Sequence, residues 1–138
     1  MRIFVDASAY IASLNKKDIN HKRAILLSKA LFQKDGEFVT SNTVLHEIYT
    51  VLSLKIDKAL AVHFHKMILK GGLPIIYVDE AIEEEAWVIF EKEKSKNVSF
   101  FDCLSFAVIK KFKIKSMFSF DKDFKRFAKR EGLNFNLA

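Results

Sequence analysis

Short apolar runs alternate with longer segments of helical periodicity along the whole chain, and this alternation constrains the fold most strongly. The short runs predict strands at 2–5, 38–40, 75–78 and 115–119, and residues 133–136 would add a fifth strand at an edge. Helices are expected at about 8–14, 18–34, 42–54, 57–70, 80–94, 101–112 and 122–130. Because parallel strands need crossover helices, the pattern predicts a three-layer α/β/α fold with a mostly parallel sheet of four to five strands.

Composition places this fold in one packed domain. The chain has 138 residues, of which 50% are hydrophobic and 29% charged, so we expect a single globular domain over residues 1–138. No apolar run approaches the roughly 20 residues that span a bilayer. The first residues read as a strand that meets a carboxylate, not as a signal peptide, and Cys103 is the single cysteine. We therefore expect a cytoplasmic protein with no membrane association.

Four separated acidic residues stand in apolar surroundings, where an ionised carboxylate is costly unless its charge is compensated. Asp6 and Asp121 follow predicted strands, whereas Glu47 and Asp102 lie near the starts of predicted helices. The carboxyl ends of parallel strands meet at one edge of a sheet, so one rim could collect all four. Helix capping is an alternative explanation for the three aspartates. Glu47 has no such explanation, because it lies inside its helix.

Electrostatics limits what such a cluster can be. Two like charges about 4 Å apart repel by about 4 kcal/mol at an effective dielectric near 20. Either some of the carboxylates are protonated, or a divalent cation neutralises them. Oxygen ligands suit Mg²⁺ or Mn²⁺ and not zinc. The histidines offer no other metal site, since His63 and His65 are two residues apart on a predicted helix and point to different faces.

Four segments around these acids resemble the PIN-domain family, whose members include metal-dependent nucleases and the VapC-type toxins of toxin–antitoxin pairs. The resemblance covers nearly the whole chain, and it depends on the order and spacing of individually loose motifs. The segments are Ile3-Phe4-Val5-Asp6-Ala7-Ser8, Glu47-Ile48-Tyr49-Thr50-Val51-Leu52, Ser99-Phe100-Phe101-Asp102-Cys103-Leu104 and Ser119-Phe120-Asp121-Lys122-Asp123-Phe124.

The resemblance implies a catalytic quartet of carboxylates around one or two Mg²⁺ or Mn²⁺ ions. Its members would be Asp6, Glu47, Asp102 and Asp121, with Asp123 as an additional or substitute metal ligand. Ser8 and Ser119 resemble small polar positions that line the site. The family often has Thr where this chain has Ser119, and that change leaves the ligands intact.

The implied reaction is hydrolysis of RNA phosphodiester bonds. The formal net charge of +6 agrees with a nucleic-acid partner, and equally with a lysine-rich surface that keeps a small protein in solution. Basic residues at helix ends are candidates to hold RNA phosphates, although each can also be plain surface. These candidates are Lys16, Lys17, Lys122, Lys125 and Arg126.

Within this reading the chain is the toxin of a VapBC-type pair, for which the resemblance implies an antitoxin protein as partner and a homodimer. Three alternatives stay open: a stand-alone PIN-domain nuclease that processes RNA, a module that binds RNA without cutting it, and a metal-dependent phosphatase of another α/β family. Such phosphatases usually carry a second Asp two residues after the first, where this chain has Ser8.

Overall fold

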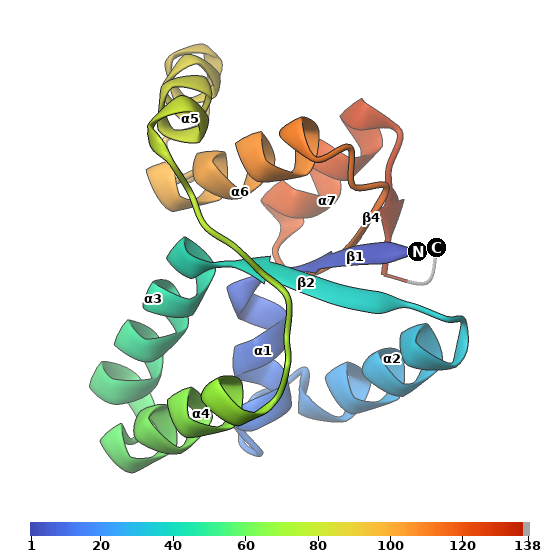
Figure 1. Ribbon diagram of the computed structural model, residues 1–138, viewed down its shortest axis with the longest axis vertical. Helices are drawn as coiled ribbons and strands as arrows, with labels where there is room; N and C mark the ends of the chain where they lie inside the picture. The colour runs from blue at the N-terminus through green and yellow to red at the C-terminus, as the bar shows by residue number, and fades with distance from the viewer. Residues whose placement is uncertain (137–138) are drawn as a thin grey trace.

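The computed structural model describes residues 1–136 and contains one parallel sheet with helices on both faces (Figure 1). The strands are β1 (Arg2–Val5), β2 (Glu37–Ser41), β3 (Ile75–Ile76), β4 (Ser116–Phe118) and β5 (Asn134–Phe135). Their order across the sheet is β3-β2-β1-β4-β5, and every neighbouring pair is parallel. The three-layer α/β/α fold with a parallel sheet, predicted from the alternation of strands and helices, is confirmed.

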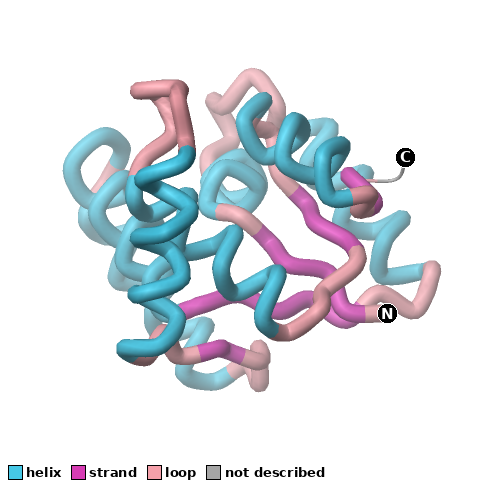
Figure 2. The backbone as a smooth tube through the Cα atoms, turned by 90° about the horizontal axis from the view of Figure 1, so that it is seen from above, coloured by secondary structure: helices cyan, strands magenta, loops and turns pink. Residues whose placement is uncertain are grey.

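Helices connect the strands, as parallel pairing requires. They are α1 (Ala7–Leu14), α2 (His21–Gln33), α3 (Asn42–Val51), α4 (Lys58–Lys70), α5 (Glu80–Lys92), α6 (Phe100–Lys111) and α7 (Lys122–Glu131). In Figure 1, α1 and α2 lie below the sheet, and α6 and α7 lie above it. Seen from above, the strands run through the middle of the molecule with the helices around them (Figure 2). No helix within residues 1–136 has the length and apolarity needed to cross a bilayer.

Side-chain alternation along the central strands builds a core on each face of the sheet. Ile3, Val5 and Phe118 are buried in a cluster with residues of α1 and α2. Phe4 and Met117 point the opposite way, into a larger cluster with residues of α3, α5, α6 and α7. Because both faces are covered, the strands read as nearly continuous apolar runs.

The order of the strands creates a switch point between β1 and β4. From β1 the chain builds outward through β2 to β3, and from β4 it continues to β5 on the other side. Val5 and Phe118 are paired at the carboxyl ends of these two strands. Ligands of open α/β sheets bind in the crevice at such a point, so the residues after Val5 and Phe118 occupy the position of interest.

Several element bounds differ from the sequence prediction, and two of the differences change local structure. The helix expected to reach about residue 54 ends as an α-helix at Val51 and continues as a π-helix, η1 (Leu52–Ile56). The Asp57 N–H donates to the carbonyl oxygen of Leu52, five residues earlier, and this bond closes the wider π turn. The third strand has two residues instead of four.

Candidate active site

Asp6 stands at the switch point, directly after β1, and is only 5% exposed. It caps α1, because its carboxylate accepts a hydrogen bond from the backbone N–H of Ser8. The same oxygen, Oδ2, also accepts bonds from the hydroxyls of Ser8 at 2.8 Å and Ser119 at 2.9 Å. The capping explanation of Asp6 is therefore correct, but two further donors hold this carboxylate in a fixed orientation.

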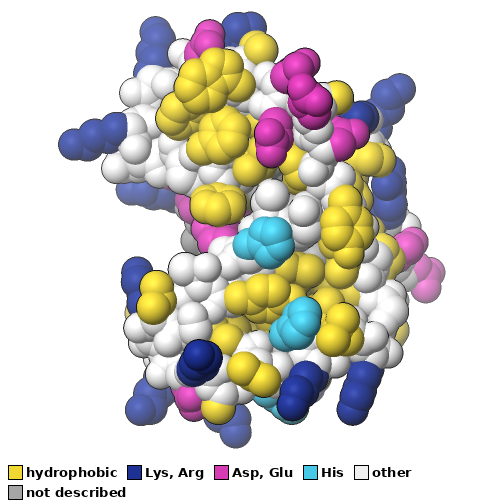
Figure 3. Space-filling view, turned by 60° about the vertical axis from the view of Figure 1, so that its left-hand side comes forward, with side chains coloured by type: hydrophobic (Ala, Val, Ile, Leu, Met, Phe, Trp, Pro, Cys, Tyr) yellow, Lys and Arg dark blue, Asp and Glu magenta, His cyan; other side chains and the backbone are white. Residues whose placement is uncertain are grey.

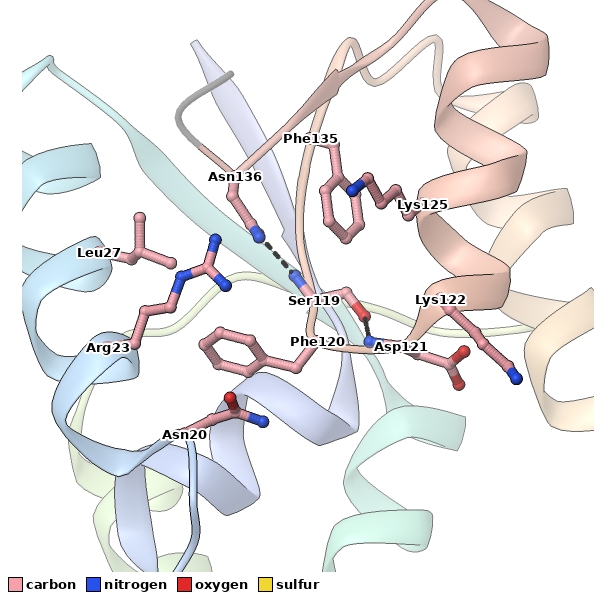
Figure 4. Close-up of a pocket in the computed structure, with 10 residues that line it drawn as sticks. All are labelled: Asn20, Arg23, Leu27, Ser119, Phe120, Asp121, Lys122, Lys125, Phe135 and Asn136. Atoms are coloured by element: carbon pink, nitrogen blue, oxygen red, sulfur yellow. Dashed lines mark hydrogen bonds between the residues drawn. The ribbon is translucent and has the colours of Figure 1, made fainter.

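The two serines join the turn after β1 to the turn after β4. Their Oγ atoms are 3.1 Å apart. The backbone N–H of Phe120 donates to Ser8 Oγ at 2.9 Å, and that of Asp121 donates to Ser119 Oγ at 3.0 Å. The Ser119 N–H in turn donates to the side-chain Oδ1 of Asn136 at 3.0 Å (Figure 4). The network places Ser8 and Ser119, which were predicted to line the site, against Asp6.

Glu47 and Asp102 come from two helices that pack against each other, α3 and α6. Glu47 is half-buried in α3, which begins after the cap Ser41. Asp102 lies in the first turn of α6 and forms a capping box with Ser99: its Oδ2 accepts from the Ser99 N–H at 3.0 Å, while its own N–H donates to Ser99 Oγ at 3.1 Å. The capping explanation of Asp102 is thus also correct, but a helix cap does not require the burial of this residue, which is only 9% exposed.

Mutual repulsion shows that the four carboxylates share one neighbourhood. Burial, together with the charges of Asp6, Asp102 and Asp121, raises the pKa of Glu47 to about 7. The pKa of Asp102 is raised to about 6 by burial, with contributions from Asp6 and Asp121. Burial also raises the pKa of Asp6, against the lowering effect of its hydrogen bonds from the two serines. The structure therefore brings these four side chains to one rim.

The donor atoms at this rim are of the types that bind a divalent cation. Carboxylate oxygens with hydroxyls beside them are the donors that Mg²⁺ and Mn²⁺ prefer. Within residues 1–136, however, no group of three or more His, Cys, Asp or Glu side chains is already arranged to hold an ion. The types of donor at this rim therefore fit such an ion.

Asp123 has a different environment from the other acids. Its carboxylate is buried and lies 3.0 Å from the guanidinium of Arg126, which also contacts Glu93 at 3.7 Å. The Asp123 N–H donates to Oδ1 of Asp121 at 2.7 Å, which caps α7. Asp123, predicted as an additional metal ligand, is thus neutralised by a cation of its own helix. Arg126, a candidate for RNA phosphates, faces two carboxylates instead.

We expect Arg126→Met to lower the free energy of unfolding by about 1 kcal/mol, because it leaves the buried Asp123 carboxylate without its cation. The guanidinium is half exposed, with 52% of the side chain accessible, which keeps the effect moderate. Chemical denaturation measures the change, and Lys129→Met, an exposed cation of the same helix, is the control. Equal losses in the two variants would show that the pairing contributes nothing.

Four other basic candidates divide into two groups. Lys16 and Lys17 are exposed just beyond the end of α1, whereas Lys122 and Lys125 line a cavity of about 390 Å³ together with Asp121. Figure 3 shows a hollow in the side of the molecule where acidic side chains are visible, with Lys and Arg side chains above and below it. Of the four candidates, Lys122 and Lys125 therefore lie beside the acidic rim, at Asp121.

The cavity also contains residues that the sequence did not mark. Arg23 and Asn20 enter it from the start of α2, and Asn136 enters it after β5 (Figure 4). Arg23 lies about a hundred positions before Lys125, and no local spacing connects them. Asn136 was expected in an edge strand; it follows that strand instead, with a positive φ of 57° that asparagine tolerates well. Pairing of β4 with β5 and packing of α2 create this group.

Fold and site together define a three-layer α/β/α protein with a carboxylate cluster at the switch point of its sheet. The sequence model of the protein family described as "PIN domain" matches residues 3–130, and the chain belongs to the PIN-domain family. The family membership expected from the four motifs is confirmed.

Several relatives and one solved structure show what the chain is similar to. It is 33% identical over 122 residues to the 23S rRNA-specific endonuclease VapC20 of Mycobacterium tuberculosis, covering 88% of this chain and 91% of that protein. It is 30% identical to ribonuclease VapC1 of Aquifex aeolicus, covering 89% of this chain and 83% of the relative. The crystal structure of VapC20, described as a sarcin-ricin loop cleaving toxin, superposes with a TM-score of 0.79 at 32% identity, covering 91% and 94% of the two chains.

Proposed function

We propose that this PIN-domain protein is a divalent-metal-dependent endoribonuclease of the VapC type, which hydrolyses RNA phosphodiester bonds. The observation that carries the proposal is the cluster of four carboxylates at the switch point between β1 and β4, where the hydroxyls of Ser8 and Ser119 hold Asp6. A cluster with perturbed pKa values at a switch point is typical of a functional site. The curated relatives are named endonucleases or ribonucleases, which supports the same class of hydrolase.

In this proposal Asp6, Glu47, Asp102 and Asp121 would hold one or two Mg²⁺ or Mn²⁺ ions. When bound, a divalent cation supplies charge that polarises a phosphoryl oxygen and lowers the pKa of water. The chain's own residues do the rest: the two serine hydroxyls on Asp6 Oδ2 keep that carboxylate oriented. A carboxylate of the cluster that is not fully engaged with the ion would take the proton of the attacking water.

The proposal extends to the biological role. Relatives named VapC, one of them described as a toxin, support a toxin of a VapBC-type pair with RNA as substrate and an antitoxin protein as partner. A homodimer is part of this proposal as well. A stand-alone RNA-processing nuclease would have the same site, and a small upstream gene or a short protein that co-purifies with the chain favours the toxin over it.

The purified protein is expected to cut single-stranded or looped RNA with Mn²⁺ or Mg²⁺, and to stop when EDTA removes the ion, because the ion carries the Lewis-acid role. Gel analysis of labelled RNA, including the sarcin-ricin loop of 23S rRNA, measures this. A phosphomonoester such as p-nitrophenyl phosphate is the control substrate. Hydrolysis of the phosphomonoester but not of RNA would favour the phosphatase alternative, and RNA binding without cleavage would favour the binding module.

A further inference from the structure

The cavity beside Asp121 combines positive charge with direct continuity to the acidic rim. Its volume of about 390 Å³ lies at the small end of ligand pockets. Its lining carries three cationic side chains, Arg23, Lys122 and Lys125, against one carboxylate, that of Asp121. A ligand that crosses the rim at Asp121 therefore passes directly into a basic environment.

Two of the three cations point into the cavity from opposite walls. Figure 4 shows the guanidinium of Arg23 directed inward from α2 and the ammonium of Lys125 directed inward from α7, whereas Lys122 extends away along the side of Asp121. Within residues 1–136, no carboxylate lies within 4 Å of any of these three cationic groups. The inward charges are available to an anion from outside the chain.

An aromatic ring keeps one of these cations in place. The guanidinium carbon of Arg23 lies 5.8 Å from the centre of the Phe120 ring, a cation–π contact. The backbone N–H of Phe120 donates to Ser8 Oγ, the hydroxyl that also holds Asp6, and the Phe120 ring packs in an edge geometry against Phe118. The position of Arg23 is thus tied to the same turn that orients the acidic rim, and a preordered cation binds an anion at lower entropic cost.

We propose that this cavity is a phosphate subsite for the RNA backbone, in which Arg23 and Lys125 hold the phosphate next to the one positioned at the acidic rim. The inference rests on the proposed ribonuclease function. Arg and Lys are the usual partners of phosphate oxygens, and Arg can bind two of them at once. The continuity through Asp121 favours RNA over a free anion, because the chain that carries the reacting phosphate must leave the rim on one side.

The double variant Arg23→Gln/Lys125→Gln tests the subsite against a matched control, Lys22→Gln/Lys129→Gln, which removes two exposed cations from the same two helices outside the cavity. Both pairs are placed in an Asp6→Asn background, which is expected not to cut, and binding of a fluorescent ten-nucleotide RNA is followed by anisotropy. The cavity variant is expected to lose affinity on the order of 10-fold, and its salt slope should fall by about 0.7, the value for one phosphate of a single strand. The control should change by less than about 3-fold.

RNAs in which one phosphate is replaced by a neutral linkage show which phosphate binds in the cavity. A set of RNAs, each with one methylphosphonate at a different position, is bound to the protein with and without the two Gln substitutions. At one position, the methylphosphonate is expected to weaken binding to the protein that has Arg23 and Lys125, but not to the variant with the two Gln substitutions. Arg23→Lys/Lys125→Arg, which keeps both charges, should retain most of the binding and so exclude a folding defect as the cause.

Equal affinity and salt slope for the cavity variant and its control, or the lack of any such position, would overturn the subsite. In that case a wild-type chain that cuts RNA with Mn²⁺ leaves the proposed function intact. Failure of the wild-type chain to cut any RNA would instead remove the proposed function, and the subsite with it. Tight binding of inorganic phosphate with no preference for RNA would also contradict the proposal.

Discussion

Replacing Asp6 or Asp102 with Asn is expected to abolish Mn²⁺-dependent RNA cleavage while leaving the fold intact. Both carboxylates belong to the buried cluster whose charges raise one another's pKa. An amide keeps the shape of the side chain but loses the charge that a divalent cation requires. Since the ion contributes several kcal/mol to the transition state, the rate should fall by about 10³-fold or more. Initial rates on a labelled RNA measure the loss, and circular dichroism checks the fold.

The helix cap that Asp6 provides makes this experiment decisive. Asn caps helices as well as Asp does, so a purely structural Asp6 would tolerate the change. Asp57 is the matched control, because it caps α4 in the same way, with its carboxylate accepting from the N–H of Ala59 at 2.8 Å. Asp57→Asn should leave cleavage unchanged. Full activity in both Asp6→Asn and Asp102→Asn would refute the metal mechanism.

Without metal, the protein is expected to lose stability as the pH rises from about 4.5 to about 7. The folded pKa of Glu47 is about 7, whereas the ordinary value is 4.5. Between these values the folded state binds more protons than the unfolded state, so the free energy of unfolding falls with increasing pH. The raised pKa values of Asp6 and Asp102 act in the same direction.

The substitution Glu47→Gln should remove much of this dependence. At pH 8 we expect the variant to be more stable than the wild type by about 1–2 kcal/mol in EDTA, after allowance for the partial exposure of Glu47. At pH 4.5 the two should be nearly equal. Denaturation at both pH values measures the difference, and Glu84→Gln, an exposed acid on α5, is the control. Added Mn²⁺ should stabilise the wild type at pH 8 and the variant less. A wild type that gains stability between pH 5 and pH 8 in EDTA would contradict the argument.

The acidic rim could be predicted because its members follow rules that act over short stretches of sequence. Asp6 and Asp121 are placed by strand ends, and Asp102 by a capping box. The prediction of Glu47 also required helical periodicity, because this residue lies within α3 at a half-buried position. The sheet then gathers these positions because parallel strands share one carboxyl edge.

The parts that could not be predicted depend on contacts between distant elements. Arg23 reaches the cavity only because α2 packs below the sheet, and Glu93 reaches Arg126 only because α5 ends beside α7. The pairing of Asp123 with Arg126 did have a local signal, since residues three apart meet on a helix. Nothing in the composition of residues 52–56 distinguishes a π turn from an α turn.

The hydrogen bond from Ser119 to Asn136 links the rim to the last described turn of the chain. Strand β4, which pairs with β1 and directly precedes Ser119, follows α6 in chain order. During synthesis, Asp6 emerges early but lacks its Ser119 partner until residues beyond 119 have left the ribosome. A nascent chain therefore has no finished rim before both Ser119 and Asn136 have left the ribosome.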